Sequence, residues 1–331
     1  MLRKAINRSL RVVRTVSNTD RRGIATSSIL LRAELIDGKK VAGEIYEELS
    51  AEVQSMVTSG RRAPHLVLVR VGGDPASGSY VKNKMKAAEK IGMQSTIHHL
   101  PEDTSQSTLL SLVNELNVDP DIDGILVQLP VPPHMEEKII CNSVIPEKDV
   151  DGFHITNIGK FCLDMECFGP CTPLGVMELI RRYGIETYGK NAVVCGRSKN
   201  VGMPMAMLLH GDGVRPDGAT GGLDATTTIC HRYTPADQLK VFTATADIIV
   251  TAAGVPGLIT GDMIKPGCAI LDVGINRIKD PVTGKAKLVG DCDFESCAEK
   301  AAFITPVPGG VGPMTVAMLM RNTVLAAKRS T

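Results

Sequence analysis

The sequence lacks three patterns that would assign the chain to a specialised class of protein. No apolar run reaches about 18 residues, the length that a membrane-spanning helix needs, so no membrane insertion is expected. No repeat or low-complexity tract follows the N-terminal segment. No Cys-x-x-Cys pair occurs, and no histidine stands at zinc-site spacing, so the cysteines are expected to be reduced thiols. They are Cys141, Cys162, Cys167, Cys171, Cys195, Cys230, Cys268, Cys292 and Cys297, and core packing is the favoured role for the 162–171 cluster.

Acidic residues are nearly absent from the first 33 positions. This segment holds eight arginines and lysines against the single acid Asp20, and without it the formal charge changes from +1 to −6. An Arg-rich, Ser-containing and acid-poor N-terminus is typical of a mitochondrial transit peptide. Residues 1–33 are therefore predicted to direct the protein to the mitochondrial matrix. A basic arm for nucleic acid remains the alternative, but the rest of the chain offers such a partner no basic face, and no nucleic-acid binding is expected.

Residues 34–155 show alternating helix and strand patterns. Asp37 can cap a helix in which Val41, Ile45, Leu49, Val53 and Val57 recur every four residues, and Gly60 can close it. Strands are predicted at residues 66–71, 94–100 and 124–129, with helices at 78–91 and 107–116. This alternation predicts an α/β domain with a parallel sheet.

A second alternating series begins near residue 191. Strands are expected at residues 192–195, 226–230, 248–252, 269–273 and 303–304, with helical stretches between them. The series is typical of a Rossmann-like, doubly wound parallel sheet that binds a nucleotide. Further helices are predicted at residues 173–183 and 313–328.

Three strand ends in this second series carry turns suited to a dinucleotide. The strand at 192–195 leads into Gly196, Arg197 and Ser198 and then an apolar helix, whose N-terminus can face a pyrophosphate. Gly254 and Gly274 follow two later strands. The usual Gly-x-Gly-x-x-Gly is absent, so tight structural turns remain an alternative at each position.

In the first domain, Tyr80 and Lys84 are four residues apart on a predicted helix, and Gln128 ends an apolar strand. The spacing puts the ring and the amine on one helix face. A solvent-facing pair is the alternative reading, but an amide at a buried strand end needs hydrogen-bond partners.

Residues 80–84, 127–130, 148–153, 196–204 and 308–315 resemble, in order, the successive signatures of the methylenetetrahydrofolate dehydrogenase/cyclohydrolase family. The likeness covers residues 33–328 and is greatest to mitochondrial NAD-linked members. It implies a folate-binding catalytic α/β domain at 34–155, completed by a C-terminal helix within 305–331. A Rossmann-like NAD-binding domain would occupy 156–304, with the active-site cleft between the domains and a homodimer formed through the cofactor domains.

The resemblance also implies the activity. Such an enzyme oxidises 5,10-methylenetetrahydrofolate to the methenyl compound with NAD and then hydrolyses it to 10-formyltetrahydrofolate. There are two alternative functions: a dehydrogenase without hydrolase activity, and an inactive binding protein with the same fold. Both are disfavoured because Lys84 and Gln128 are intact, and the inactive protein also because Asp151 is retained.

By similarity, Lys84 is the catalytic amine, Tyr80 stacks along the folate, Gln128 positions Lys84, and Asp151 accepts hydrogen bonds from the pterin. A lysine with an ordinary pKa of about 10.4 would be too basic for this role, so burial or polar neighbours must lower that pKa. The implied substrate-binding set is Tyr80, Lys84, Val127, Gln128, Leu129, Asp151, Pro308, Gly309, Gly310, Val311 and Gly312. The implied cofactor-binding set is Gly196, Arg197, Ser198, Arg232, Gly254, Gly274 and Ile275.

A preference for NAD over NADP is expected from Arg232, because NADP-linked relatives carry serine there. Arg197 and Arg232 would hold an inorganic phosphate in the place of the 2′-phosphate, and Asp224 would supply an oxygen ligand to Mg²⁺. The alternative is that Arg232 binds the 2′-phosphate of NADP directly.

Overall fold

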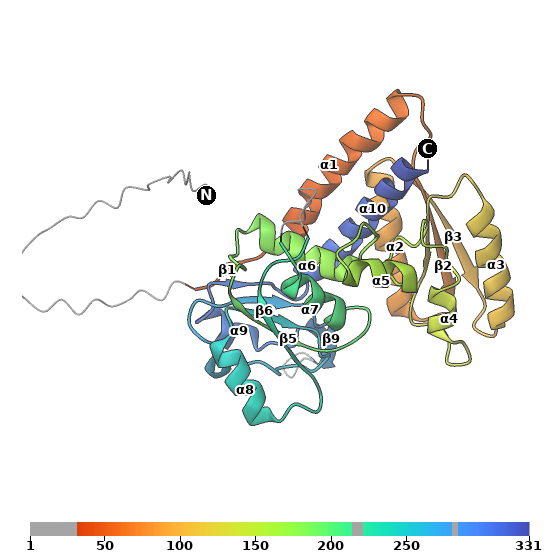
Figure 1. Cartoon of the computed structure of the whole chain (residues 1–331). Helices are drawn as coiled ribbons and strands as arrows, with labels where there is room; N and C mark the ends of the chain where they lie inside the picture. The colour runs from red at the N-terminus through yellow and green to blue at the C-terminus, as the bar shows by residue number, and fades with distance from the viewer. Residues whose placement is uncertain (1–31, 214–220, 280–283, 331) are drawn as a thin grey trace, which may run out of the picture. The chain divides into compact units, whose positions relative to one another are not determined.

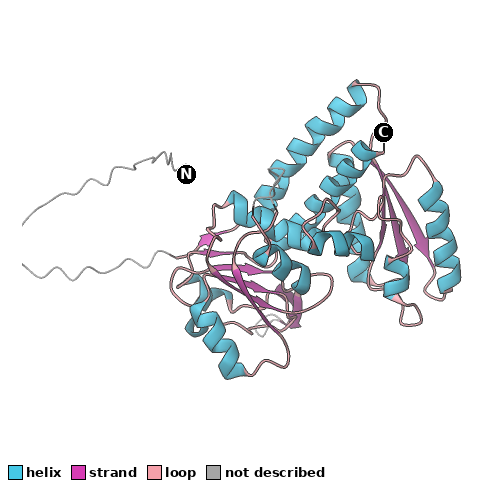
Figure 2. Cartoon of the chain, viewed as in Figure 1, coloured by secondary structure: helices cyan, strands magenta, loops and turns pink. Residues whose placement is uncertain are grey.

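The computed structural model describes residues 32–213, 221–279 and 284–330. Most of the expected transit peptide, residues 1–31, therefore lies outside the described residues, as does most of the Gly-rich insertion that precedes Asp224. In the described part, helices pack on two parallel sheets (Figure 2). No described helix is long and apolar enough to cross a membrane.

The first sheet is parallel and three-stranded, with order β3-β2-β4. Its strands are β2 (His65–Val71), β3 (Gln94–Leu100) and β4 (Gly124–Val127), and the helices of this part of the chain are α1 (Gly38–Thr58), α2 (Pro75–Lys90), α3 (Gln106–Val118) and α4 (Glu137–Cys141). The central strand β2 is almost wholly buried, as its apolar run requires. The Asp37 side chain caps α1 by accepting from the Lys40 N–H at 3.0 Å, and Gly60 beyond that helix has φ +89°.

The second sheet is six-stranded, with order β1-β11-β8-β7-β5-β6, and all its strand pairs are parallel. Its strands are β1 (Glu34–Leu35), β5 (Asn191–Cys195), β6 (Thr226–Cys230), β7 (Ile248–Thr251), β8 (Ala269–Asp272) and β11 (Phe303–Ile304). The elements that accompany it are α7 (Gly202–His210), α8 (Ala236–Thr245), the short 3₁₀ helix η1 (Gly261–Met263) and α9 (Phe294–Ala298). This arrangement confirms the expected two-part α/β fold with a Rossmann-like sheet.

Two features of this region differ from the expected elements. Residues 34 and 35 were placed with the first domain, but β1 pairs with β11 at the edge of the second sheet. An antiparallel hairpin, β9 (Asn276–Lys279) and β10 (Ala286–Val289), follows β8. Neither feature is marked by an apolar repeat, because a two-residue edge strand and a partly exposed hairpin of two four-residue strands bury too little apolar surface to produce one.

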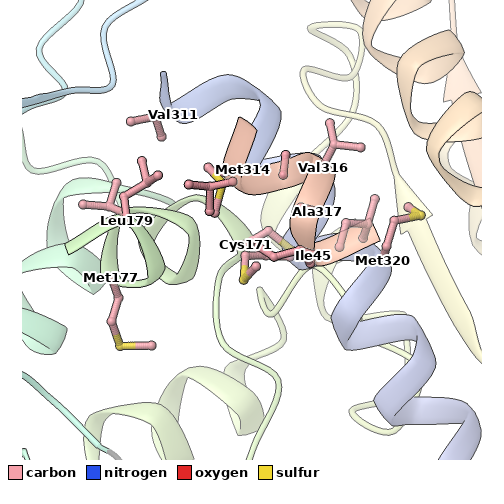
Figure 3. Close-up of a cluster of buried hydrophobic side chains, with 14 of the residues drawn as sticks. Ile45, Cys171, Met177, Leu179, Val311, Met314, Val316, Ala317 and Met320 are labelled. Carbon is pink, nitrogen blue, oxygen red and sulfur yellow. The ribbon is translucent and has the colours of Figure 1, made fainter. Parts of the chain in front are cut away.

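Three helices complete the described chain: α5 (Ile155–Cys162), α6 (Cys171–Arg182) and α10 (Val311–Arg329). The C-terminal helix α10 packs against α1, α2 and α6, and it also contacts β4 (Figure 1). The approach to α6 is close, because a Cβ at Gly175 would lie 2.9 Å from the Met314 Cβ. Figure 3 shows the resulting core, in which side chains from α1, α6 and α10 interlock.

Candidate active site

Lys84 lies on α2 and is almost completely buried, with 7% of its surface exposed. Its Nζ donates to the Gln128 Oε1 at 2.9 Å. The Gln128 Nε2 in turn donates to the Leu129 carbonyl at 2.7 Å, which fixes the orientation of the amide. Since Gln128 follows β4 directly, the end of that strand presents an acceptor to a buried amine, as a buried polar group requires.

The electrostatic surroundings of Lys84 act in opposite directions. Burial lowers the pKa of Lys84, while the negative charge of Asp151 and the neighbouring Cys171 raise it. Burial raises the pKa of Asp151, and Lys84 lowers it. The amine is therefore easier to deprotonate than a surface lysine but still has a carboxylate close enough to stabilise its charge. Such a balance suits a group that both gives and takes a proton.

Tyr80 precedes Lys84 by one helical turn on α2 and has 40% of its surface exposed. A half-exposed ring beside a buried amine can stack on a planar ligand while its helix holds it in place. Val127 is buried at the end of β4, and Leu129 is part-buried. The structure thus joins Lys84 of α2 to Gln128 after β4, with Tyr80 one turn before Lys84 on the same helix.

The segment that carries Asp151 is held by a second buried carboxylate. Asp149 accepts main-chain N–H bonds from residues 152, 153 and 154, together with the Asn157 Nδ2 at 2.8 Å. Burial raises the pKa of Asp149 to about 7, although the hydrogen bonds lower it. Gly152 has φ +76°, and a Cβ there would lie 2.5 Å from the Gly169 carbonyl carbon. The turn around Asp151 therefore has little freedom to move.

The sequence did not reveal Cys171 as part of this site. Its buried thiol donates to the Val150 carbonyl at 3.3 Å and interacts with Asp151 and Lys84. Burial raises the pKa of Cys171 well above its usual value, so the group stays a neutral thiol. Asn322 of α10 donates its Nδ2 to the carbonyls of Val150 (2.9 Å) and Gly169 (3.1 Å), which flank Asp151 and Cys171 in the chain. All these partners are distant in sequence, so no local pattern marks them.

The glycine-rich loop before α10 packs closely against the start of α1. A Cβ at Gly38 would lie 1.8 Å from the Gly310 oxygen, and the Lys39 N–H donates to the Gly309 carbonyl at 3.1 Å. A Cβ at Gly310 would itself meet the Pro306 oxygen at 2.7 Å, whereas Gly312 has open space. Close backbone packing thus accounts for Gly310. The substrate-binding role expected for residues 308–312 stays a prediction.

The turn after β5 has the strand–turn–helix form expected for dinucleotide binding. Gly196 has φ +141°, and a Cβ there would lie 2.3 Å from the Ala252 oxygen. A Cβ at Gly202, the first residue of α7, would lie 2.3 Å from the Gly196 oxygen. The Ser198 Oγ accepts from the Gly202 N–H at 3.2 Å. The turn is therefore compact and brings the N-terminus of a nine-residue helix to the carboxyl end of β5, where an anion is favoured.

Arg197 and Arg232 both lie against the ring of Tyr233. The guanidinium carbons of Arg197 and Arg232 lie 5.6 Å and 5.3 Å from the centre of the Tyr233 ring. Both guanidinium groups therefore contact one exposed ring, and an anion held between them stays a prediction. In contrast, Asp224 precedes β6 and Arg232 follows it, so the two residues stand at opposite ends of a five-residue strand.

That strand separates them by on the order of 15 Å at about 3.3 Å per residue. The Asp224 Oδ1 accepts from the Gly213 N–H at 3.0 Å, and Asp224 has φ +53°. Asp224 and Arg232 thus flank opposite ends of β6 in the chain. The expectation that one phosphate–magnesium pair spans these two residues stays a prediction.

Gly254 and Gly274 follow β7 and β8, which are neighbours in the sheet. Gly254 has φ +70° and open space around a built Cβ, whereas a Cβ at Gly274 would lie 2.3 Å from the Asp291 carboxylate. Ile275 is 48% exposed. The strand ends thus form an edge with exposed apolar groups, and the packing reason for Gly274 is a buried aspartate that the sequence did not reveal.

Two family models match the chain. One, described as "Tetrahydrofolate dehydrogenase/cyclohydrolase, catalytic domain", matches residues 36–151, and the other, described as "Tetrahydrofolate dehydrogenase/cyclohydrolase, NAD(P)-binding domain", matches residues 170–331. The chain belongs to the tetrahydrofolate dehydrogenase/cyclohydrolase family. The resemblance found in the sequence motifs is confirmed.

Individual family members agree with this assignment. The chain is 57% identical over 310 residues to the human "Bifunctional methylenetetrahydrofolate dehydrogenase/cyclohydrolase 2, mitochondrial", covering 93% of this chain and 88% of the human protein. It is 57% identical over 297 residues to the Drosophila melanogaster bifunctional mitochondrial enzyme, covering 90% of this chain and 95% of that protein. A solved 5,10-methylenetetrahydrofolate dehydrogenase from Bombyx mori superposes with a TM-score of 0.84 at 49% identity, covering 90% of this chain and 98% of that one.

Proposed function

We propose that this protein oxidises 5,10-methylenetetrahydrofolate to 5,10-methenyltetrahydrofolate with NAD and hydrolyses that product to 10-formyltetrahydrofolate, in mitochondrial one-carbon metabolism. Family membership supports both activities, and the mitochondrial names of the human and Drosophila relatives support the location. The observation that carries the proposal is the buried Lys84 amine, which donates to Gln128 and is close to Asp151.

Each residue of this group has a proposed role. Lys84 takes a proton from the water that attacks the methenyl carbon and returns it to the ring nitrogen N5 when the bond between that carbon and N5 breaks, and Gln128 holds the Lys84 Nζ in place. Tyr80 stacks on the folate, and Asp151 accepts hydrogen bonds from the pterin ring. Val127 and Leu129 border the same position from the end of β4, and residues 308–312 line the folate site. The substrate lies between these groups and the cofactor.

Lys84→Met tests the assignment, because it removes the amine but keeps an unbranched side chain. We expect the variant to lose hydrolysis of added methenyltetrahydrofolate, which is measured as the decay of that compound's absorbance. Circular dichroism should show that the fold is intact. Lys82→Met is the matched control, since Lys82 is an exposed lysine on the same helix. Hydrolysis at the parent rate in the Lys84 variant would refute the proposal.

The cofactor site is proposed at the carboxyl edge of the six-stranded sheet. The compact turn from Gly196 to Gly202 fits a pyrophosphate, because it brings backbone close to the start of α7. NAD supplies the acceptor for the hydride when bound. Arg197, Ser198, Arg232, Gly254, Gly274 and Ile275 complete the proposed contacts.

A preference for NAD follows if Arg197 and Arg232 hold an inorganic phosphate where NADP would place its 2′-phosphate. The pairing of both guanidinium groups with Tyr233 supports such an anion site. Mg²⁺ bound to Asp224 remains a separate proposal that rests on the carboxylate alone. Direct binding of the 2′-phosphate by Arg232 is the competing idea.

Initial rates with NAD and NADP, each with and without phosphate and Mg²⁺, discriminate between these ideas. If phosphate assists NAD, Arg232→Ala abolishes the activation and Asp224→Asn abolishes the response to Mg²⁺. Higher activity with NADP in the parent would support the competing idea instead. A response to Mg²⁺ that survives in Asp224→Asn would remove this residue from the site.

Two further proposals concern assembly and targeting. A homodimer formed through the cofactor domains agrees with the position of β6 at a sheet edge and with exposed Ile229 and Tyr233. Sedimentation velocity should give twice the chain mass. For the matrix location, sequencing the N-terminus of the protein recovered from mitochondria should give a start within residues 22–36.

A further inference from the structure

Asp291 lies between β10 and α9 and is completely buried, with 0% exposure. Its Oδ2 accepts from the N–H groups of Ala253 (2.6 Å) and Gly254 (3.1 Å). Its Oδ1 accepts from the Val255 N–H at 2.9 Å and from the Asn276 Nδ2 at 2.8 Å. Four donors thus converge on one carboxylate, which satisfies the negative charge without an ion pair in the described part of the chain.

These donors belong to two segments that follow neighbouring strands. Ala253, Gly254 and Val255 form the turn after β7, and Asn276 comes directly after Ile275, beyond the end of β8. Ligands of doubly wound sheets bind beyond such carboxyl ends. Asp291 therefore connects, through its hydrogen bonds, the two segments between which a cofactor ring would lie.

The surroundings of Asp291 are built to hold it. Gly274 has no side chain where a Cβ would lie 2.3 Å from the Asp291 Oδ1. Asp272, at the end of β8, accepts from the Asp291 N–H at 3.0 Å and the Cys292 N–H at 2.8 Å. A Cβ at Gly290 would lie 2.0 Å from the Asp272 Oδ2. Two glycines thus make room for two buried carboxylates.

The direction of these bonds also determines what the turn can offer a ligand. Three successive N–H groups point inward to Asp291, so they are unavailable to a phosphate. Val255 and Ile275 remain 47% and 48% exposed at the same edge. An uncharged or weakly cationic ring fits exposed apolar groups better than it fits a nest of N–H donors.

We infer that Asp291 is the positioning residue for the nicotinamide end of the cofactor, because it fixes the turn at 253–255 and the segment at 274–276 relative to each other. None of the hydrogen bonds given above for Asp291 involves Lys84 or the other residues proposed to bind folate. The inference rests on the proposed dehydrogenase function, and it predicts that disturbing Asp291 separates the two activities.

Asp291→Asn is the decisive variant, because it keeps the shape of the side chain but replaces one accepting oxygen by an NH₂ group that faces other N–H donors. We expect the KM for NAD to rise at least about tenfold. Hydrolysis of added methenyltetrahydrofolate, which needs no cofactor, should stay within about twofold of the parent. Asp237→Asn, an exposed aspartate on α8, is the matched control and should change neither activity.

A second variant and a binding measurement keep the test decisive. Asn276→Ala removes one donor and should raise the KM for NAD by a smaller factor, even if Asp291→Asn does not fold. The chain has no tryptophan whose emission bound NADH could quench, so NADH binding is titrated through the fluorescence of NADH itself. A parent that oxidises no methylenetetrahydrofolate would overturn the proposed function, while NADH binding would still report on Asp291. An unchanged KM for NAD, or a parallel loss of hydrolysis, would overturn the positioning role.

Discussion

The hydrogen bond between Lys84 and Gln128 makes a quantitative prediction. Gln128→Ala removes the amide oxygen that accepts from the buried Nζ at 2.9 Å. A hydrogen bond to a charged group contributes about 1.5–3 kcal/mol, which corresponds to roughly a 10- to 150-fold loss of rate if the bond is needed in the transition state. We therefore expect hydrolysis of methenyltetrahydrofolate to fall within that range.

The pH–rate profile gives a sharper result than the rate alone. Burial already lowers the pKa of Lys84, so loss of an acceptor for the ammonium should lower it further. Gln128→Glu should have the opposite effect, because a carboxylate beside the amine stabilises its charged form. The limb that reports Lys84 should move to lower pH in the alanine variant and to higher pH in the glutamate variant.

The assay follows the decay of methenyltetrahydrofolate absorbance across neutral pH, with the enzyme-free rate subtracted. Gln128→Glu also loses the donor to the Leu129 carbonyl, so its absolute rate should fall as well. The direction of the limb is therefore the readout. Movement of both variants in the same direction, or of neither, would refute the role of Gln128.

Three further predictions concern the turn at Asp151 and the core. Asp151→Ala should weaken folate binding more than turnover, because a non-reacting ring makes the same bonds in ground and transition states; a larger loss of turnover than of affinity would contradict this. Asp149 has a raised pKa of about 7 against 3.8 in the unfolded chain, so its contribution to stability is present below about pH 4 and is lost as the pH rises through 7. Between about pH 4 and about pH 8, the free energy of unfolding measured in urea should fall by about 4 kcal/mol more in the parent than in Asp149→Asn. An equal fall in both proteins would count against this. Gly175→Ala should cost about 1–3 kcal/mol of stability, because the new Cβ would lie 2.9 Å from the Met314 Cβ. Gly43→Ala is the control, since Gly43 has open space within α1, and it should not destabilise the protein. Equal effects of the two substitutions in thermal melts would exclude the close contact as the cause.

The sequence was sufficient for elements whose pattern repeats locally. The four-residue recurrence from Val41 to Val57 marked α1, and Asp37 marked its start. The buried strand β2 follows from the apolar run at residues 66–69. Family motifs placed Lys84 and Gln128 in one site, and their hydrogen bond agrees with that placement. Boundaries were less certain, since α2 begins at Pro75 rather than Gly78.

Groups whose partners are far apart in the chain could not be found in this way. Cys171 meets Val150 across 21 positions, and Asp291 meets the turn at 253–255 across about 36 to 38. Burial, too, is a tertiary property, and it is the main cause of the lowered pKa of Lys84.

The sequence by itself determined the two series of helices and strands and the family, and it singled out the side chains that are proposed to react, because periodicity and motifs act over short stretches of chain. Only the tertiary structure decided which polar groups share a buried environment, and therefore which carboxylates face an amine and which face backbone N–H groups. The reason is physical: a charge loses its water only when distant segments close over it, and its surviving partners are those that the fold brings within hydrogen-bond distance.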